Sequence, residues 1–215
     1  MPTRDLTQPL DDGVTVYPGD PPVERTPAAT HASDGYRVTE VRLGTHSGTH
    51  VDAPSHTEPD GKNLDEFAVE RFAFDARLVD CSSSGARDPI GPESVPDGAD
   101  AEMLVFRTGW DDHWGTERYY DHPYLAPETA AKCAERGYHV GTDALSPDPS
   151  PSARDAERET EPDGVPAHRE LLGSELLVVE NLTATGDLPE RFELRAYPLA
   201  LAGADGSPVR AVAAW

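Results

Sequence analysis

The chain has 215 residues and a formal net charge of −22, because 40 acidic residues face 18 basic ones. This charge repels nucleic acid and anionic lipid, so neither is an expected partner, and the length suits one domain with a real core. The sequence holds no run of about 18 apolar residues and no export signal near Met1, so we expect a single cytoplasmic domain over residues 1–215.

The first half of the chain predicts mainly short strands. Residues 15–17 read as a strand that runs into a proline-rich turn at 18–22, and residues 36–43 alternate like a strand with one solvated face. Residues 63–72 suggest a short helix, and residues 76–81 a buried strand. Cysteines lie only at Cys81 and Cys133, too far apart for a zinc or redox motif, and both are expected to be buried.

The second half alternates strands and helices, which predicts an α/β fold. A helix is expected to start at Pro127 and to end before Gly137, which suits a helix C-terminus. His113 and His122 lack partners at ligand spacing, so we interpret both as surface or substrate-proximal residues. The remaining predicted elements are strands at 103–110, 139–143 and 176–179, a helix at 167–172, and a turn with a last strand at 203–212.

One segment, residues 146–166, breaks this alternation. It contains five prolines, many charged residues and almost no large apolar residue, so it should not contribute to the core. Two interpretations stay open. The segment is either a disordered connection or a mobile loop that acts as a lid or a dimer contact.

The densest cluster of polar residues lies between Thr45 and His56. Three of the eight histidines fall there together with Asp52, and imidazole and carboxylate are ligands for zinc, manganese and similar ions. Gly48 and Pro54 favour a tight turn over a helix. A zinc protease would carry Glu where this chain has Ser47, which excludes that class. The pattern indicates a metal site.

Residues 46–56 match the signature His-x-Gly-Thr-His-x-Asp-x-Pro-x-His at every fixed position. The chain thereby resembles the cyclase family, whose best-known members are bacterial kynurenine formamidases. Further likeness lies in Tyr17 before Pro-Gly-Asp, in the Arg-Thr-Gly at 107–109 and in the segment 141–146, so the resemblance runs from about Val14 to Val212. It implies a β-rich swivelling β/β/α fold with the metal site in a cleft, and usually a homodimer.

The resemblance also assigns site residues. It implies two metal ions that share Asp52 as a ligand, one residue that acts as general acid and base, and one residue that lines the substrate pocket. The two ions would be zinc, with manganese possible. An independent argument supports Glu180, because an unpaired carboxylate directly after four apolar residues is costly unless a cation lies beside it. The implied residues are the ligands His46, His50, Asp52, His168 and Glu180, the proton carrier His56 and the pocket residue Tyr17.

The reaction implied first is hydrolysis of N-formyl-L-kynurenine to L-kynurenine and formate, a step of tryptophan catabolism. One alternative is an enzyme that hydrolyses another amide or a lactam such as isatin. A second alternative is a metal-binding protein without turnover. Structural zinc sites are closed by four ligands that commonly include thiolates, whereas this cluster contains no cysteine. The ligand types therefore favour an enzyme.

The acidic residues are spread along the whole chain, and only two of the basic residues are lysines, Lys62 and Lys132. Such a surface is typical of proteins from organisms with high internal salt, where screening removes the self-repulsion. We therefore expect a halophilic protein, and the acidity indicates habitat and not substrate.

Overall fold

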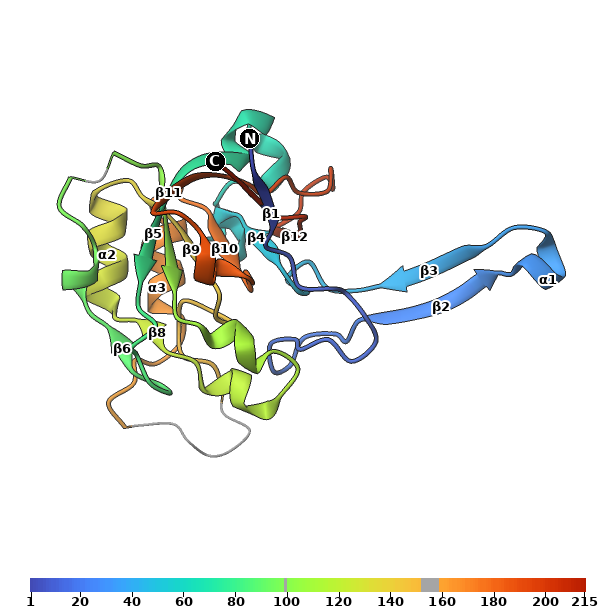
Figure 1. Ribbon diagram of the computed structural model, residues 1–215, viewed down its shortest axis with the longest axis horizontal. Helices are drawn as coiled ribbons and strands as arrows, with labels where there is room; N and C mark the ends of the chain where they lie inside the picture. Colours follow the sequence, from blue (N-terminus) through green and yellow to red (C-terminus); the bar gives the residue numbers. More distant parts are fainter. Residues whose placement is uncertain (99, 152–158) are drawn as a thin grey trace.

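The computed structural model describes residues 1–98, 100–151 and 159–215 (Figure 1). Over these residues a curled, mixed sheet of nine strands forms the body, in the order β1-β13-β11-β5-β7-β9-β10-β4-β12. Its strands are β1 Thr3–Asp5, β4 His50–Asp52, β5 Ala73–Asp80, β7 Met103–Arg107, β9 His139–Thr142, β10 Val178–Glu180, β11 Arg191–Arg195, β12 Gly206–Pro208 and β13 Val212–Ala214.

The central strands β5, β7, β9 and β10 are parallel, and each of the other pairs is antiparallel. Helices α2 (Pro127–Glu135) and α3 (Pro166–Leu172) pack together beside the sheet, and a small sheet joins β6 (Pro89–Ile90) to β8 (Tyr124–Leu125) (Figure 1). The α/β class is confirmed. Pro127 starts α2 and Gly137, at φ +73°, follows its end, as predicted.

Three apolar clusters form the core of the described residues, and the two larger ones contain alternate residues of the same strands. Val51 and Val179 belong to the cluster that includes Phe74, whereas Val178 belongs to the cluster beneath α2 and α3. This alternation follows from the two-residue period of a strand. Both cysteines are buried in the second cluster, and burial raises the pKa of each thiol to about 12.

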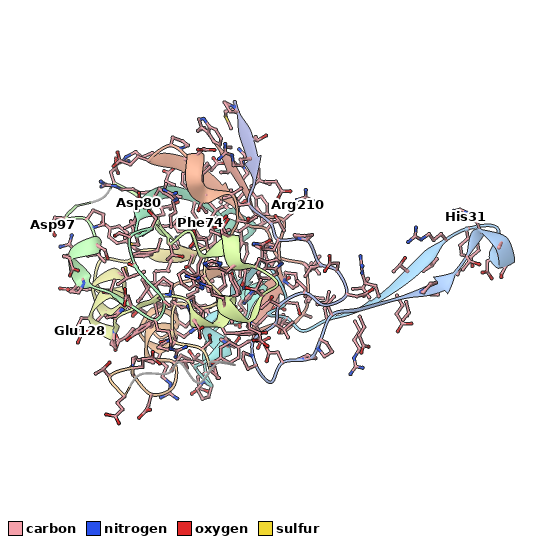
Figure 2. The ribbon with its side chains drawn as sticks, turned by 60° about the horizontal axis from the view of Figure 1, so that its bottom comes forward. His31, Phe74, Asp80, Asp97, Glu128 and Arg210 are labelled. Atoms are coloured by element: carbon pink, nitrogen blue, oxygen red, sulfur yellow. The ribbon has the colours of Figure 1, made fainter. Side chains whose placement is uncertain are left out.

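A long arm projects from the body. It consists of β2 (Glu24–Ala29) and β3 (Val38–Arg42), joined by α1 (His31–Asp34), and His31 lies at its far end (Figures 1 and 2). The sequence predicted one solvated face for this strand, but all five residues of β3 are exposed. The prediction was wrong because no described element covers either face of the arm.

Two other predicted elements differ from the structure. Residues 15–17 form no strand and lead directly into the turn at 17–20. The helix expected at 63–72 is split into short 3-10 turns at Leu64–Glu66 and Val69–Phe72, because Phe67 and Ala68 between them have extended backbone. The part of the chain that the structure describes contains no helix long and apolar enough to cross a membrane.

The segment 146–166 begins inside the molecule. Ser146, Asp148 and Ser150 are all buried, although the composition predicted a segment outside the core. Hydrogen bonds explain the difference, since the Ser150 hydroxyl lies within hydrogen-bond distance of both His122 Nε2 and the Tyr120 carbonyl. The mobile loop or lid expected here falls in part on residues 152–158, which lie outside the described residues.

Candidate metal centre

Strand β4 lies between β10 and β12 and carries His50 and Asp52, two of the predicted metal ligands. His50 pairs with Glu180 and Asp52 pairs with Gly206 in the strand register. Side chains two residues apart on a strand, and those directly opposite on the next strand, share a face. His50, Asp52 and Glu180 therefore project to the same side. The predicted tight turn is wrong for residues 50–52, which form a strand, and it holds before them, where Gly48 has φ +65°, and after them, at Pro54–His56.

His46 reaches this face from the turn that precedes β4. Its Nδ1 lies 2.7 Å from Asp52 Oδ1, and its Nε2 lies 3.1 Å from Asp205 Oδ2. The strand β12 passes directly against the ring, because a Cβ added to Gly206 would lie 2.5 Å from His46 Cε1. Glycine at 206 is thus required for the observed position of the imidazole.

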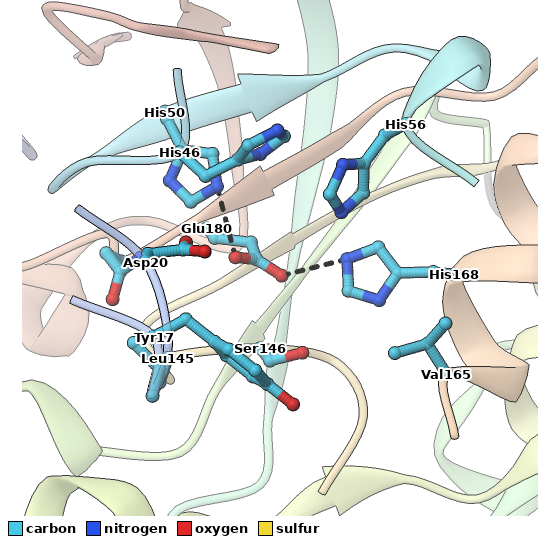
Figure 3. A pocket seen from close by; sticks show the side chains of 11 residues that line it. Tyr17, Asp20, His46, His50, His56, Leu145, Ser146, Val165, His168 and Glu180 are labelled. Carbon is cyan, nitrogen blue, oxygen red and sulfur yellow. Dashed lines mark ion pairs between the residues drawn. The ribbon is translucent and has the colours of Figure 1, made fainter. Parts of the chain in front are cut away.

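His168 comes from the first turn of α3. The buried carboxylate of Asp148 accepts hydrogen bonds from the backbone N–H of Ala167 at 2.7 Å and of His168 at 3.0 Å, and it contacts His168 Nδ1 at 2.7 Å. These contacts fix both the helix start and the ring. His168 Nε2 consequently faces Glu180 Oε1 at 3.1 Å (Figure 3). Asp52 Oδ2 lies 3.7 Å from the same nitrogen.

The five side chains form two groups that share Asp52. Within each group the donor atoms lie within 4.8 Å of one another, a spacing that suits a common metal ion. Asp52 uses Oδ1 toward His46 and His50 and Oδ2 toward His168. The groups are His46, His50 and Asp52, and Asp52, His168 and Glu180.

Three atoms of these groups test whether a cation fits. His50 Nε2, Asp52 Oδ2 and Glu180 Oε1 are buried and make no aligned hydrogen bond within the described chain. Their close contacts, such as 3.2 Å from His50 Nε2 to Glu180 Oε2, are ion-pair contacts without hydrogen-bond alignment. Buried polar atoms without hydrogen bonds are costly, and such atoms gathered at ligand spacing suit divalent ions. The residues fit a metal centre.

The electrostatics of the cluster agree with this fit. Burial would lower the pKa of His46, but its contacts with Asp205 and Asp52 raise it to about 9. The pKa values of His50 and His168 are likewise raised, against burial, by Asp52, Glu180 and, for His168, Asp148. Without a metal, protons on the imidazoles therefore balance the carboxylates, and a cation must displace them.

His56 stands at the edge of both groups, on the 3-10 turn Pro54–His56. Its ring centre lies 4.0 Å from that of His46 and 5.6 Å from that of His168. Partial burial lowers its pKa, so the ring is neutral near pH 7 and can accept a proton. His56 also forms a group of ligand spacing with His46 and Asp205, so metal retention in a His56 variant distinguishes a proton carrier from a ligand.

A cavity opens onto the cluster. Tyr17 lines it, as the resemblance implied, together with the apolar side chains of Leu145 and Val165 (Figure 3). Burial raises the pKa of the Tyr17 hydroxyl. The remaining lining residues are Asp20, His46, His50, His56, Ser146, His168, Glu180 and Asn181.

Sequence reasoning did not assign a role to three acidic residues near this site. Asp20 is the last residue of the Pro-Gly-Asp segment that follows Tyr17 in the sequence. Asp148 and Asp205 show no characteristic spacing in the sequence, and only the fold brings them into contact with His168 and His46. The interpretation of His122 was also wrong. It is buried, and Nε2 contacts Ser150 Oγ at 3.0 Å, so it supports the loop from inside.

The family model described as "Putative cyclase" matches residues 4–149, more than half of the chain. A kynurenine formamidase from Salinibacter ruber is 35% identical over 97% of this chain and 95% of its own length, and one from Bacillus cytotoxicus is 32% identical with the same coverage. The chain belongs to the cyclase family.

Solved cyclase-like structures have the same fold. Isatin hydrolase A from Labrenzia aggregata, solved with benzyl benzoate, superimposes with a TM-score of 0.84 at 24% identity and covers 99% of this chain and 93% of its own. A predicted metal-dependent hydrolase from Bacillus stearothermophilus gives 0.77 at 25% identity, with 99% and 97% covered. The fold is thus that of cyclase-family hydrolases.

Proposed function

We propose that this protein is a metal-dependent amide hydrolase that converts N-formyl-L-kynurenine and water to L-kynurenine and formate. The observation that carries the proposal is the sharing of Asp52 by two groups of ligand spacing, with His56 beside both. Curated relatives named kynurenine formamidase, at 35% and 32% identity over nearly the full length, support the same reaction.

The proposed cofactor is a pair of divalent ions, zinc in the first place and manganese as the alternative. His46, His50 and Asp52 would hold one ion, and Asp52, His168 and Glu180 the other. When bound, such ions supply Lewis acidity, which polarises a carbonyl and makes water more acidic.

The proton transfers fall to His56. The neutral ring takes a proton from the attacking water and then delivers it to the aryl nitrogen, which cannot depart as an anion at neutral pH. Partial burial keeps the ring neutral before the reaction, since it lowers the pKa. About 32% of the side chain remains exposed, so the ring can meet both water and substrate.

Isatin is the second candidate substrate, because isatin hydrolases share the fold. The deciding experiment loads the protein with zinc or manganese and measures hydrolysis of N-formyl-L-kynurenine and of isatin under identical conditions. The proposal expects the formamide to have the higher kcat/KM. A higher kcat/KM for isatin would make isatin hydrolysis the proposed reaction instead. Hydrolysis of neither substrate would favour a metal-binding protein without catalysis.

We further propose that the 215 residues form a single cytoplasmic domain that assembles as a homodimer through the arm. Tyr36, Val38 and Val41 are exposed on the arm by 59%, 45% and 50%. A two-stranded hairpin is at best marginally stable in water, so a second copy that covers these side chains would stabilise it.

We also propose that the stability of the protein depends on salt. A net charge of −22 repels itself when the screening length grows from about 3 Å at 1 M salt to about 30 Å at 0.01 M. Circular dichroism melts at these salt concentrations, with metal kept saturating, should show a lower melting temperature in dilute buffer. An unchanged melting temperature would reject the halophilic interpretation.

A further inference from the structure

One carboxylate in the cavity wall belongs to neither metal group. Asp20 lines the cavity together with Tyr17, Glu180 and His56 (Figure 3). In the proposed mechanism the cluster carboxylates Asp52 and Glu180 hold metal, which leaves Asp20 available to the substrate.

The turn that carries Asp20 is rigid. Its N–H donates to the Tyr17 carbonyl at 3.0 Å, Gly19 has φ +107°, and prolines occupy positions 18, 21 and 22. The turn also packs closely against the loop that leads to His46, since a Cβ added to Gly44 would lie 3.3 Å from Pro21 Cγ. The backbone therefore holds Asp20 beside the site without a contact from its own side chain.

No described residue contacts the carboxylate of Asp20 with an opposite charge. Within the described chain no hydrogen-bond donor and no basic group contacts its carboxylate, whereas Asp52, Glu180, Asp148 and Asp205 each contact a histidine. Among residues 1–98, 100–151 and 159–215, those that line the cavity include no lysine and no arginine. Asp20 is exposed, so water solvates its carboxylate, and a ligand that enters the cavity with its own cation can replace this water.

We propose that Asp20 is the subsite for a primary ammonium group, and that it binds the α-ammonium of an amino-acid substrate. This inference rests on the proposed function and deepens it, because N-formyl-L-kynurenine carries such a group and isatin does not. The carboxylate accepts charge-assisted hydrogen bonds from the ammonium, while Tyr17, Leu145 and Val165 provide apolar surface for the aryl ring. Asp20 would thus select substrates with an amino-acid end.

The test compares Asp20→Asn with the wild type in the metal-loaded enzyme. One substrate is N-formyl-L-kynurenine, and the other is 2'-formamidoacetophenone, which has the same ring, ketone and formamide but no amino-acid end. We expect kcat/KM to fall about tenfold or more for the first, mainly through KM, and to change less than about twofold for the second. The matched control is Asp11→Asn, which removes the same charge from an exposed residue of the same N-terminal stretch.

A binding measurement keeps the inference separate from the proposed reaction. Calorimetry with L-kynurenine and with 2'-aminoacetophenone needs no turnover, so it decides even if neither formamide is hydrolysed. The inference expects Asp20→Asn to weaken L-kynurenine binding alone. Equal weakening of both ligands, or no weakening, would overturn it, and so would a loss of bound metal in Asp20→Asn, which would make Asp20 a part of the metal centre.

Discussion

Strands β3 and β4 lie close together in the sequence and have opposite environments. All five residues of β3 are exposed, although they include two valines, and all three residues of β4 are buried, although two of them are ionisable. The neighbours explain the difference, because β4 is paired on both sides by β10 and β12, whereas β3 pairs only with β2. Burial here follows from tertiary pairing and not from the hydropathy of the strand.

The metal cluster and the arm each contain groups in an unfavourable environment. The metal cluster buries charged groups that need a cation, and the arm exposes apolar groups that need a covering surface. Changes in the two regions should therefore have separate consequences. Changes at the cluster should alter metal binding and turnover, and changes in the arm should alter assembly.

The largest expected effect is that of pH on metal binding. The pKa of His46 in the metal-free protein is raised to about 9, so each ion must displace protons below that pH. The apparent affinity for metal should therefore rise as the pH increases from 6 to 9. If one proton is released per ion, the rise is about tenfold per pH unit, or about 10³-fold over this range. Competition with a chelator of known proton affinity measures this, and a flat profile would contradict the account. An arm variant should show the same profile.

Loss of the proton carrier comes next in size. His56→Ala should lower kcat by about 10²-fold or more, the usual scale for removal of a general acid and base, and should leave metal content unchanged. Turnover and elemental analysis are measured on the same samples. The control is His113→Ala, a half-buried histidine outside the cluster. Loss of metal in His56→Ala would make His56 a ligand, together with His46 and Asp205.

A smaller effect is expected when the support of His168 is removed. Asp148→Asn keeps the size of the side chain but removes the negative charge that faces His168 Nδ1. Outer-shell partners of this kind typically contribute 10- to 100-fold to metal affinity, so we expect about a tenfold weaker second ion. Titration with metal should show one weakened step and one unchanged step. Equal weakening of both steps would indicate general damage to the fold.

The smallest effect on chemistry is expected from the arm. Val38→Glu combined with Val41→Glu places charges on its exposed surface and should convert the proposed dimer to a monomer, as measured by light scattering. Metal content should remain the same. A monomeric wild type would reject the role proposed for the arm, and loss of metal in the variant would show that the two regions are not separate.

The sequence pointed to the residues that the structure gathers into two groups of ligand spacing, but not to the residues that support them. The signature at residues 46–56 is local, and the strands predicted at 76–81, 103–110 and 139–143 correspond to β5, β7 and β9. Asp205 lies 159 residues from His46, so no pattern in a single sequence links them. The exposure of the arm could not be predicted either, because its alternation is the one expected for a half-buried strand.

The central claim is that Asp52 is shared by two ions, and the direct measurement is the number of metal ions bound per chain. Under saturating zinc or manganese, followed by removal of free metal, the wild type should hold two ions and Glu180→Ala one, because Glu180 belongs only to the group with His168. The exposed Glu170→Ala serves as the control and should hold two. A wild type that holds a single ion, or a Glu180→Ala variant that retains both, would contradict the two-ion site.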